Sequence, residues 1–192
     1  FYLDDLKPAL VIVAQNSDNP VRESAVGLSI PVVEAKVGAG DPAGVFQLFD
    51  VEESLNPSGP SMEALVLHTS GTTSRPKVVP LMQSNLAASV RNIASSIELS
   101  PKDHCLNIMP LFHIHGLIAV LATSVSKGAS VCCLPGFNAL KFLDFATEEE
   151  ITWFSGVPTM HQALLTRARK NLPKSRALKL RLIRSSSASL PP

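Results

Sequence analysis

Short apolar runs alternate with stretches of helical spacing along most of the chain. The runs predict strands at residues 9–14, 30–33, 64–68, 104–109, 129–134, 151–155 and 178–184. Apolar residues that recur every three or four positions predict a helix at residues 83–98, and further helices are predicted at residues 116–126, 138–149 and 158–170. Strands that alternate with helices indicate an α/β fold, with a mostly parallel sheet flanked by helices.

Residue types at the element ends support these boundaries. Ser84 and Asn138 can each cap the helix that begins there, and Pro158 suits a first helical turn. The strand predicted at 64–68 is expected to be buried and to end in a loop. Residues 41–60 carry Gly, Pro, Asn and Ser instead of a periodic pattern, so they are expected to form a surface connection within the domain.

The composition is that of a folded domain without a strongly charged face. The 192 residues are 45% apolar and 17% charged, and the formal net charge is +1. A nucleic-acid partner would require a concentrated basic surface. The basic residues between 167 and 184 are the one cluster, and they are expected to form a solvated face around a helix end and a loop.

The cysteines and the longest apolar runs argue against two classes of protein, disulfide-rich domains and membrane-spanning proteins. An odd number of cysteines, Cys105, Cys132 and Cys133, argues against a disulfide framework. Their apolar neighbours predict buried core thiols, which fits a reducing intracellular compartment. No apolar stretch reaches the roughly 20 residues that a membrane-spanning helix needs.

The segment from His68 to Lys77 carries the clearest chemistry. It follows a predicted strand and places several hydroxyl residues around Gly71, ahead of a lysine. Backbone N–H groups and hydroxyls can donate to phosphate oxygens, and a lysine adds positive charge. The spacing is not that of a Walker A loop. From these residues alone, a polar turn between a strand and a helix is an alternative to a phosphate site.

The segment from Thr69 to Lys77 resembles the phosphate-binding signature of the adenylate-forming superfamily, which includes acyl-CoA synthetases, luciferases and peptide-synthetase adenylation domains. Three later segments resemble further landmarks of that family in the same order, at residues 110–116, 156–159 and 184–190. The chain is therefore expected to be a partial N-terminal domain of such an enzyme over residues 1–192. The loop, the Phe-His-Ile-His-Gly step and Ile-Arg-Ser-Ser-Ser-Ala together resemble the oxalate–CoA ligase branch of fungi and plants.

This resemblance implies ATP-dependent activation of a carboxylic acid, with oxalate as the best candidate, to an acyl-adenylate and then to an acyl-CoA. It implies ATP and CoA as substrates, with Mg²⁺ bridging the phosphates. The β- and γ-phosphates would be held by Thr69, Ser70, Gly71, Thr72, Thr73 and Lys77. Val78 stands where the family usually has glycine, and its β-branched side chain puts the mobility of the loop in question.

The acid and the adenosine are expected at two other segments. The resemblance implies an acid pocket formed by His113, His115, Val157, Arg184 and Ser185, and an adenosine site formed by Ser186, Ser187, Ala188 and Ser189. On an extended segment His113 and His115 would face the same side. Arg184 could hold the second carboxylate of oxalate, because a guanidinium binds a carboxylate bidentately. A surface salt bridge for Arg184 and a structural role for His115 are the alternatives.

Trp153 and Phe154 are expected in the core, and His68, His104 and His161 are given structural roles. No metal-ligand set is evident. The family's magnesium-side glutamate, its ribose-binding aspartate and the C-terminal domain with the catalytic lysine are not in the sequence, so no complete catalytic set is expected and the piece alone is expected to be inactive.

Two other functions are alternatives: a 4-coumarate-type or fatty-acid-type ligase and a truncated nucleotide-binding product. The resemblance suggests a cytoplasmic or peroxisomal location.

Overall fold

The computed structural model describes residues 1–48, 62–69, 76–171, 173, 175 and 177–190. The chain divides into two compact units, Phe1–Pro57 and Ser58–Pro192. Of the predicted connection at 41–60, residues 41–48 are described, and they include the short strand β3. The rest of that connection lies outside the described residues.

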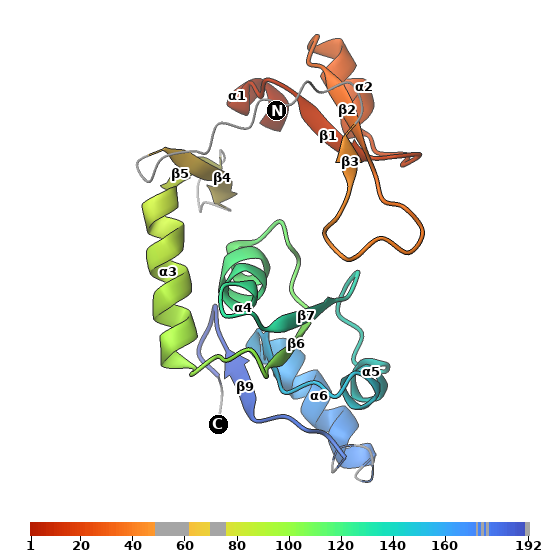
Figure 1. Ribbon diagram of the computed structural model, residues 1–192, viewed down its shortest axis with the longest axis vertical. Helices are drawn as coiled ribbons and strands as arrows, with labels where there is room; N and C mark the ends of the chain where they lie inside the picture. Colours follow the sequence, from red (N-terminus) through yellow and green to blue (C-terminus); the bar gives the residue numbers. More distant parts are fainter. Residues whose placement is uncertain (49–61, 70–75, 172, 174, 176, 191–192) are drawn as a thin grey trace. The chain divides into compact units, whose positions relative to one another are not determined.

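The first unit is a small three-stranded sheet with two helices (Figure 1). Its elements are α1 (Tyr2–Leu6), β1 (Val11–Ala14), α2 (Val21–Gly27), β2 (Val32–Lys36) and β3 (Gln47–Leu48). Strand β1 is parallel to β2, and β3 is antiparallel to β2. Arg22 of α2 forms an ion pair with Glu34 of β2 at 2.7 Å, and Ala25 of the same helix is fully buried. These contacts hold α2 against the sheet.

The second unit begins with an antiparallel hairpin, β4 (Glu63–Thr69) and β5 (Lys77–Met82). The sequence predicted the first strand and missed the second, because Pro80 interrupts a short run that continues directly into a helix. The prediction that the first strand is buried is wrong, since its residues are half-buried or exposed. A two-stranded hairpin has open edges and covers little apolar surface of its own.

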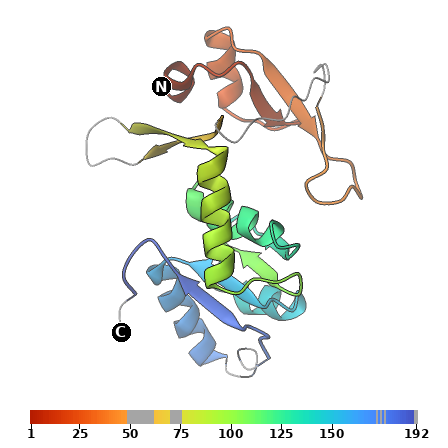
Figure 2. The same cartoon turned by 60° about the vertical axis from the view of Figure 1, so that its left-hand side comes forward.

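Helix α3 (Gln83–Ser96) follows the hairpin without a loop, as Figure 2 shows. Its start agrees with the prediction, but the capping contact is different. Asn85, and not Ser84, supplies the side chain: the Met82 N–H donates to Asn85 Oδ1 at 2.9 Å. An oxygen acceptor three residues into the helix satisfies a backbone donor that has no partner within the helix.

The rest of the second unit is a four-stranded parallel sheet in the order β7-β6-β8-β9. The strands are β6 (His104–Asn107), β7 (Ser130–Cys133), β8 (Trp153–Gly156) and β9 (Leu182–Ser185). The helices between them are η1 (His115–Ala122), which is a π-helix, α4 (Thr123–Val125), α5 (Phe142–Glu148) and α6 (Pro158–Lys170). The α/β architecture with a parallel sheet and flanking helices is confirmed.

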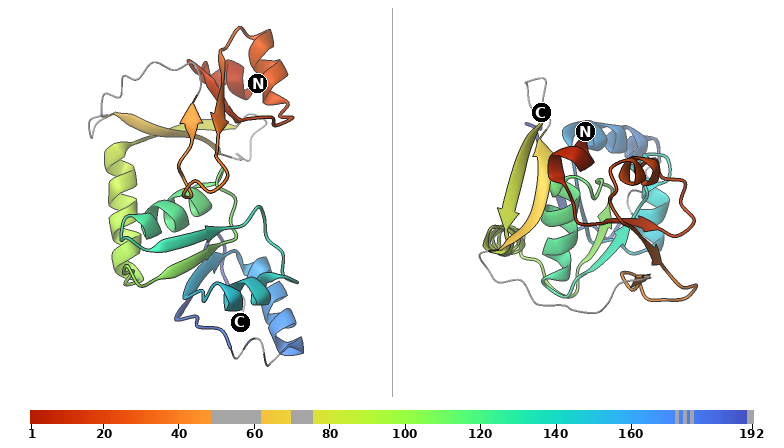
Figure 3. Two further views of the ribbon diagram at one scale, coloured as in Figure 1. Left: turned by 45° about the vertical axis from the view of Figure 1, so that its right-hand side comes forward. Right: turned by 90° about the horizontal axis from the view of Figure 1, so that it is seen from above.

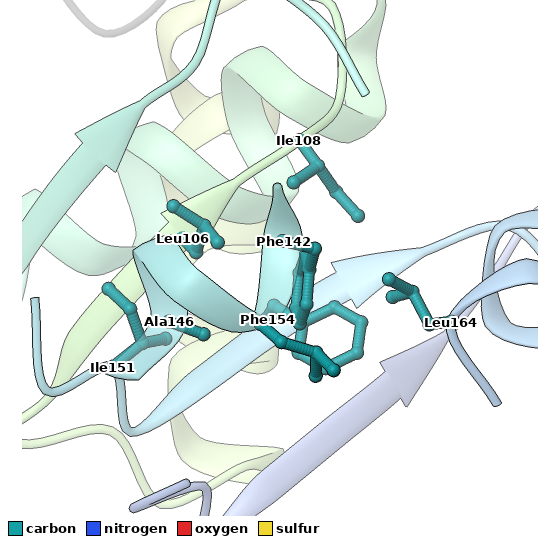
Figure 4. Close-up of a cluster of buried hydrophobic side chains, with 8 residues drawn as sticks. Leu106, Ile108, Phe142, Ala146, Ile151, Phe154 and Leu164 are labelled. Atoms are coloured by element: carbon teal, nitrogen blue, oxygen red, sulfur yellow. The ribbon is translucent and has the colours of Figure 1, made fainter. Parts of the chain in front are cut away.

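The two faces of this sheet are covered by different helices (Figure 3). Helices α5 and α6 pack on one face, in a cluster that includes Leu106, Phe142, Phe154 and Leu164 (Figure 4). The Phe142 and Phe154 rings meet edge to face at a centroid distance of 4.8 Å. Helices α3 and η1 pack on the other face, around Trp153, which is fully buried. The core roles predicted for Trp153 and Phe154 are confirmed.

Two other predictions from composition are wrong in part. Cys105 is fully buried, but Cys132 is half-buried and Cys133 is exposed, because they lie on the edge strand β7. The basic cluster is not uniformly a solvated face: Arg181 binds the buried carboxylate of Asp103, and Arg184 is half-buried. In the part of the chain that the structure describes, no helix is long and apolar enough to cross a membrane.

Candidate acid-binding site

The candidate site lies at the carboxyl ends of β8 and β9. In open parallel sheets, ligands bind beyond this edge because the loops that follow the strands meet there. Ser155 and Arg184 are direct partners in the register of these two strands, so their side chains stand on the same face of the sheet. That face is the one covered by α3 and η1, where Trp153 and Leu182 precede them. Every second residue of a strand faces the same side of the sheet, so the apolar pair Trp153 and Leu182 is followed on this face by the polar pair Ser155 and Arg184.

His115 completes the group from the first turn of η1. Its side chain is buried, with 7% exposed. The Nε2 atom lies 2.7 Å from Ser155 Oγ, and Nδ1 lies 3.3 Å from Ser187 Oγ. The Arg184 guanidinium donates from Nη1 to the same Ser155 Oγ at 3.1 Å. One fully buried hydroxyl therefore joins an imidazole and a guanidinium.

Burial and like charge act together on the titratable groups of the site. The pKa of His115 is lowered, first by burial and then by the positive charge of Arg184 and by His161. The pKa of Arg184 is lowered by burial, although a guanidinium remains charged at any ordinary pH. Of the residues that the structure describes, no carboxylate pairs with Arg184. The site therefore holds uncompensated positive charge, which suits an anionic ligand.

His161 of α6 fixes the backbone on which this group stands. Its Nε2 lies 3.2 Å from the Gly156 carbonyl oxygen and 3.1 Å from that of Arg184. Carbonyl oxygens only accept, so Nε2 carries a proton that both carbonyls share. This contact ties the end of β8 to the end of β9, in keeping with the structural role expected for His161.

The position of His115 depends on a close backbone approach at Gly116. A Cβ on this residue would lie 2.4 Å from the Pro110 carbonyl oxygen and 2.8 Å from that of Met109. Only glycine allows η1 to begin this close to the preceding turn. Within the helix, the Thr123 hydroxyl donates to the Ile118 carbonyl oxygen at 2.7 Å. The same carbonyl oxygen also accepts from the Thr123 backbone N–H, in the i to i+5 pattern of a π-helix.

The other predicted acid-pocket residues lie apart from this group. His113 is exposed, and its ring lies tilted against that of Phe112 at a centroid distance of 4.5 Å, in a turn where the His113 backbone N–H donates to the Pro110 carbonyl oxygen. The prediction that His113 and His115 face the same side is wrong, because the segment is a turn entering a helix and not an extended strand. Ser185 faces α6 and lines an apolar cavity of about 440 Å³ with Phe154 and Leu164. Val157 is half-buried at the start of α6.

The segment predicted to contact adenosine follows β9 directly. The Ser186 N–H donates to the Gly156 carbonyl oxygen at 3.2 Å, which extends the pairing of β8 and β9 by one residue. Ser187 adopts a left-handed backbone conformation with φ of 75°. Ser187, Ala188 and Ser189 are exposed. Their backbone groups are accessible, and adenosine contacts here stay a prediction.

The predicted phosphate loop is only framed by the described residues. Thr69 and Lys77 are paired at the loop end of the β4–β5 hairpin and are exposed, while Ser70, Gly71, Thr72 and Thr73 lie outside the described residues. Val78 pairs with His68 within the hairpin. A β-branched side chain favours this extended conformation, so Val78 fits the strand that begins after the loop.

Across the described ranges, no group of three or more His, Cys, Asp or Glu side chains forms a metal site. Chemically, the site at β8 and β9 offers cationic and hydroxyl donors without carboxylates. Such a donor set fits an anion and does not fit a divalent cation held by protein side chains.

The whole chain, residues 1–192, matches the family model of AMP-binding enzymes. The chain is 40% identical over 200 residues to an oxalate–CoA ligase of Arabidopsis thaliana and 43% identical over 203 residues to a probable CoA ligase, CCL9, of Humulus lupulus. Both alignments cover 100% of this chain and 38% of the relative. The chain therefore belongs to the AMP-binding enzyme family and spans well under half the length of these relatives.

A solved structure supports the same assignment. The ternary product complex of a malonyl-CoA ligase, with methylmalonyl-CoA and AMP bound, superimposes with a TM-score of 0.78 at 28% identity. The match covers 99% of this chain and 38% of that one. The resemblance inferred from the four sequence segments to the adenylate-forming enzymes is confirmed, as is the likeness to oxalate–CoA ligases.

Sequence reasoning missed Ser155, the residue at the centre of the group. It was included in the strand predicted at 151–155 and given no role. A signal was present: a serine two residues after Trp153 on a buried strand must satisfy its hydroxyl inside the protein. What the sequence did not show is which partners would meet it, because His115 and Arg184 lie 40 and 29 residues away in the chain.

Proposed function

We propose that the protein containing this chain is an ATP-dependent, AMP-forming acid–CoA ligase whose acid is a small dicarboxylate, with oxalate as the best candidate. In such an enzyme a substrate carboxylate attacks the α-phosphate of ATP and releases pyrophosphate. The CoA thiol then displaces AMP from the acyl-adenylate. The protein contributes positioning and stabilisation of phosphate charge.

The observation that carries the choice of acid is Arg184. Its guanidinium is half-buried and has no carboxylate partner among the described residues, which is a costly arrangement unless a ligand supplies the charge. Oxalate has one carboxylate to react and one to pair with Arg184. A fatty or aromatic monocarboxylic acid has no second carboxylate, so it would leave the guanidinium unpaired. His115 lies beside this group, and its lowered pKa means that it adds no second positive charge there near neutral pH.

ATP is proposed to lie across two segments of the second unit. Thr69 and Lys77 would bring the loop between them to the β- and γ-phosphates, with Ser70, Gly71, Thr72 and Thr73 as further donors and Mg²⁺ bound with the nucleotide. Ser186 to Ser189 would meet the adenosine. The geometry of β8 and β9 supports this arrangement, because it brings the segment 186–189 next to the acid site at one edge of the sheet.

Malonate is the second candidate, because the solved malonyl-CoA ligase has the same fold over this chain. Oxalate and malonate both carry a second carboxylate and differ by one methylene group. Pairing with Arg184 would not separate them, whereas the space between the arginine and the reacting carboxylate would.

The direct test is acid-dependent AMP release by the full-length enzyme. Oxalate, malonate, 4-coumarate and a long-chain fatty acid would be compared at equal concentration with ATP, Mg²⁺ and CoA. We expect the highest kcat/KM with oxalate, lower values with malonate and little turnover with the two monocarboxylic acids. A preference for 4-coumarate or the fatty acid would reject the dicarboxylate proposal. ATP binding without AMP release with any acid would indicate a non-catalytic nucleotide-binding protein.

A further inference from the structure

The hydrogen bonds of Ser155 determine which atoms of the acid site carry protons. Its hydroxyl group is fully buried, and its oxygen lies 3.1 Å from Arg184 Nη1 and 2.7 Å from His115 Nε2. A guanidinium only donates hydrogen bonds, so Ser155 Oγ must accept from Arg184. The single hydroxyl proton of Ser155 then needs an acceptor of its own.

His115 Nε2 is the acceptor that the described residues offer for that proton. If Nε2 carried a proton instead, Ser155 Oγ would accept twice and its own proton would be buried without an acceptor. The favoured arrangement is therefore Arg184 N–H to Ser155 Oγ, and Ser155 O–H to His115 Nε2. A neutral imidazole has one N–H, so in His115 it lies on Nδ1 and points to Ser187 Oγ at 3.3 Å.

We propose that Ser155 is a positioning residue of the acid site: it orients the Arg184 guanidinium and fixes the tautomer of His115 that donates to Ser187. This inference rests on the proposed function, since it gives that site its working geometry. One N–H group of Arg184 donates to Ser155, and the described residues leave its other N–H groups to bind a carboxylate. Ser187, which accepts from His115, keeps its own proton to donate to an anionic oxygen.

The charged and titratable groups around His115 act in the same direction. Burial disfavours its protonation most, and the charges of Arg184 on β9 and His161 on α6 disfavour it further. The donated proton of Ser155 also favours the neutral form, because a hydrogen bond to Nε2 is made only while that nitrogen is unprotonated. Removing the Ser155 hydroxyl removes this last contribution and leaves the others in place.

Kinetics of the full-length enzyme give the first test, with Ser155→Ala as the variant. We expect the KM for oxalate to rise roughly tenfold, by the loss of one oriented charged hydrogen bond, with the KM for ATP unchanged and kcat within about threefold. The matched control is Ser124→Ala, another fully buried serine, whose hydroxyl donates to the Val120 carbonyl oxygen at 2.7 Å and lies outside the acid site. Ser155→Thr keeps the hydroxyl and should restore the oxalate KM.

The pKa of His115 gives a second readout that needs no turnover. NMR titration of the imidazole signals, assigned with His115→Asn, should show a higher pKa in Ser155→Ala than in the parent protein and no change in Ser124→Ala. An unchanged pKa, or equal kinetic losses in the two alanine variants, would overturn the positioning role. If the enzyme releases no AMP with any acid, the proposed function fails, and the NMR result still decides the role of Ser155.

Discussion

Two arginines at opposite ends of β9 show how the same side chain serves structure in one place and ligand binding in another. Arg181, just before the strand, binds Asp103 through Nε at 2.6 Å and Nη2 at 2.8 Å. It also donates to the carbonyl oxygens of Ile97 and Glu98 at the end of α3. Arg184 lies near the carboxyl end of β9 and contacts Ser155. Arg181 has a carboxylate partner and carbonyl acceptors within the protein, whereas Arg184 has no carboxylate partner among the residues that the structure describes.

The electrostatics follow the same division. The pKa of Arg181 is raised, first by its hydrogen bonds to Asp103, whereas burial lowers the pKa of Arg184. Asp103 is 3% exposed, and the Arg181 bonds, opposed in part by burial, hold its pKa at about 2. The buried Asp103 carboxylate before β6, bound by Arg181 before β9, thus joins these two strands to the end of α3. A partly buried charge with no counterion among the described residues is kept at a cost to stability, which is typical of a binding site.

The largest effect that separates the two arginines should be on stability. Arg181→Leu leaves the Asp103 carboxylate buried and unpaired, so the free energy of unfolding should fall by about 3 kcal/mol. Arg184→Leu removes an uncompensated charge and should change it by less than about 1 kcal/mol. Urea unfolding of both variants measures the difference. Equal losses would mean that Arg184 has a structural counterion and is not reserved for a ligand.

The next effect concerns the backbone that holds the ligand-binding end. Gly116→Ala should lower the free energy of unfolding by about 2 kcal/mol, because the new Cβ would overlap the Pro110 carbonyl oxygen. Gly136→Ala is the matched control, since a Cβ there would meet nothing within 4 Å. Thermal unfolding of the two variants is sufficient. Similar behaviour would indicate that η1 can shift without strain and that the position of His115 is not fixed in this way.

The parallel sheet and the ligand role of Arg184 were predicted from the sequence, whereas contacts between residues far apart in the chain were not. The alternation of apolar runs and helical spacing predicted the parallel sheet, and α6 was predicted with its observed bounds, because Pro158 and the amphipathic pattern are local signals. Strand β5 was missed because its pairing with β4 is a tertiary property. Arg184 was identified as a ligand candidate, but Arg181 three residues earlier was placed on a solvated face.

The misassigned residues share one cause. Asp103 and Arg181 are 78 positions apart, and the sequence pattern around each does not reveal the other. His113 and His115 were placed on one side because an extended segment was assumed, whereas the chain enters a π-helix there. Ser185 was placed in the acid pocket with Arg184 by the family resemblance, and its side chain faces α6, because adjacent residues on a strand face opposite sides of the sheet.

A smaller effect is expected at the Asp103–Arg181 pair, where the free energy of unfolding should depend on pH in the acid range. The pKa of Asp103 in the fold is about 2, below its ordinary value of 3.8, so its contribution is fully present above about pH 4 and is lost as the pH falls through about 2. We expect about 1–2 kcal/mol to disappear over this range, measured as the pH dependence of the unfolding free energy. Asp103→Asn should flatten the profile. A profile unchanged by that variant would remove Asp103 as its origin.

The smallest effect belongs to the ligand-binding end and lies nearer neutrality. The pKa of His115 is lowered in the fold, so the unfolded chain binds the proton more readily. Stability from the neutral imidazole is therefore complete above the ordinary histidine pKa of about 6.5 and declines as the pH falls below it. His115→Asn should remove this decline, while His104→Asn serves as a control at a half-buried histidine at the amino end of β6. A decline that persists in His115→Asn would assign it to another group.

The central claim is that Arg184 pairs with the second carboxylate of the acid. It is tested most directly by the kcat/KM of Arg184→Leu for oxalate and for glyoxylate, which lacks that carboxylate, in the full-length enzyme, with Arg169→Leu as the control. The account predicts a loss of roughly 100-fold with oxalate, as expected for one or two charged hydrogen bonds, and less than about threefold with glyoxylate. Equal losses with the two acids, or unchanged oxalate kinetics, would contradict it.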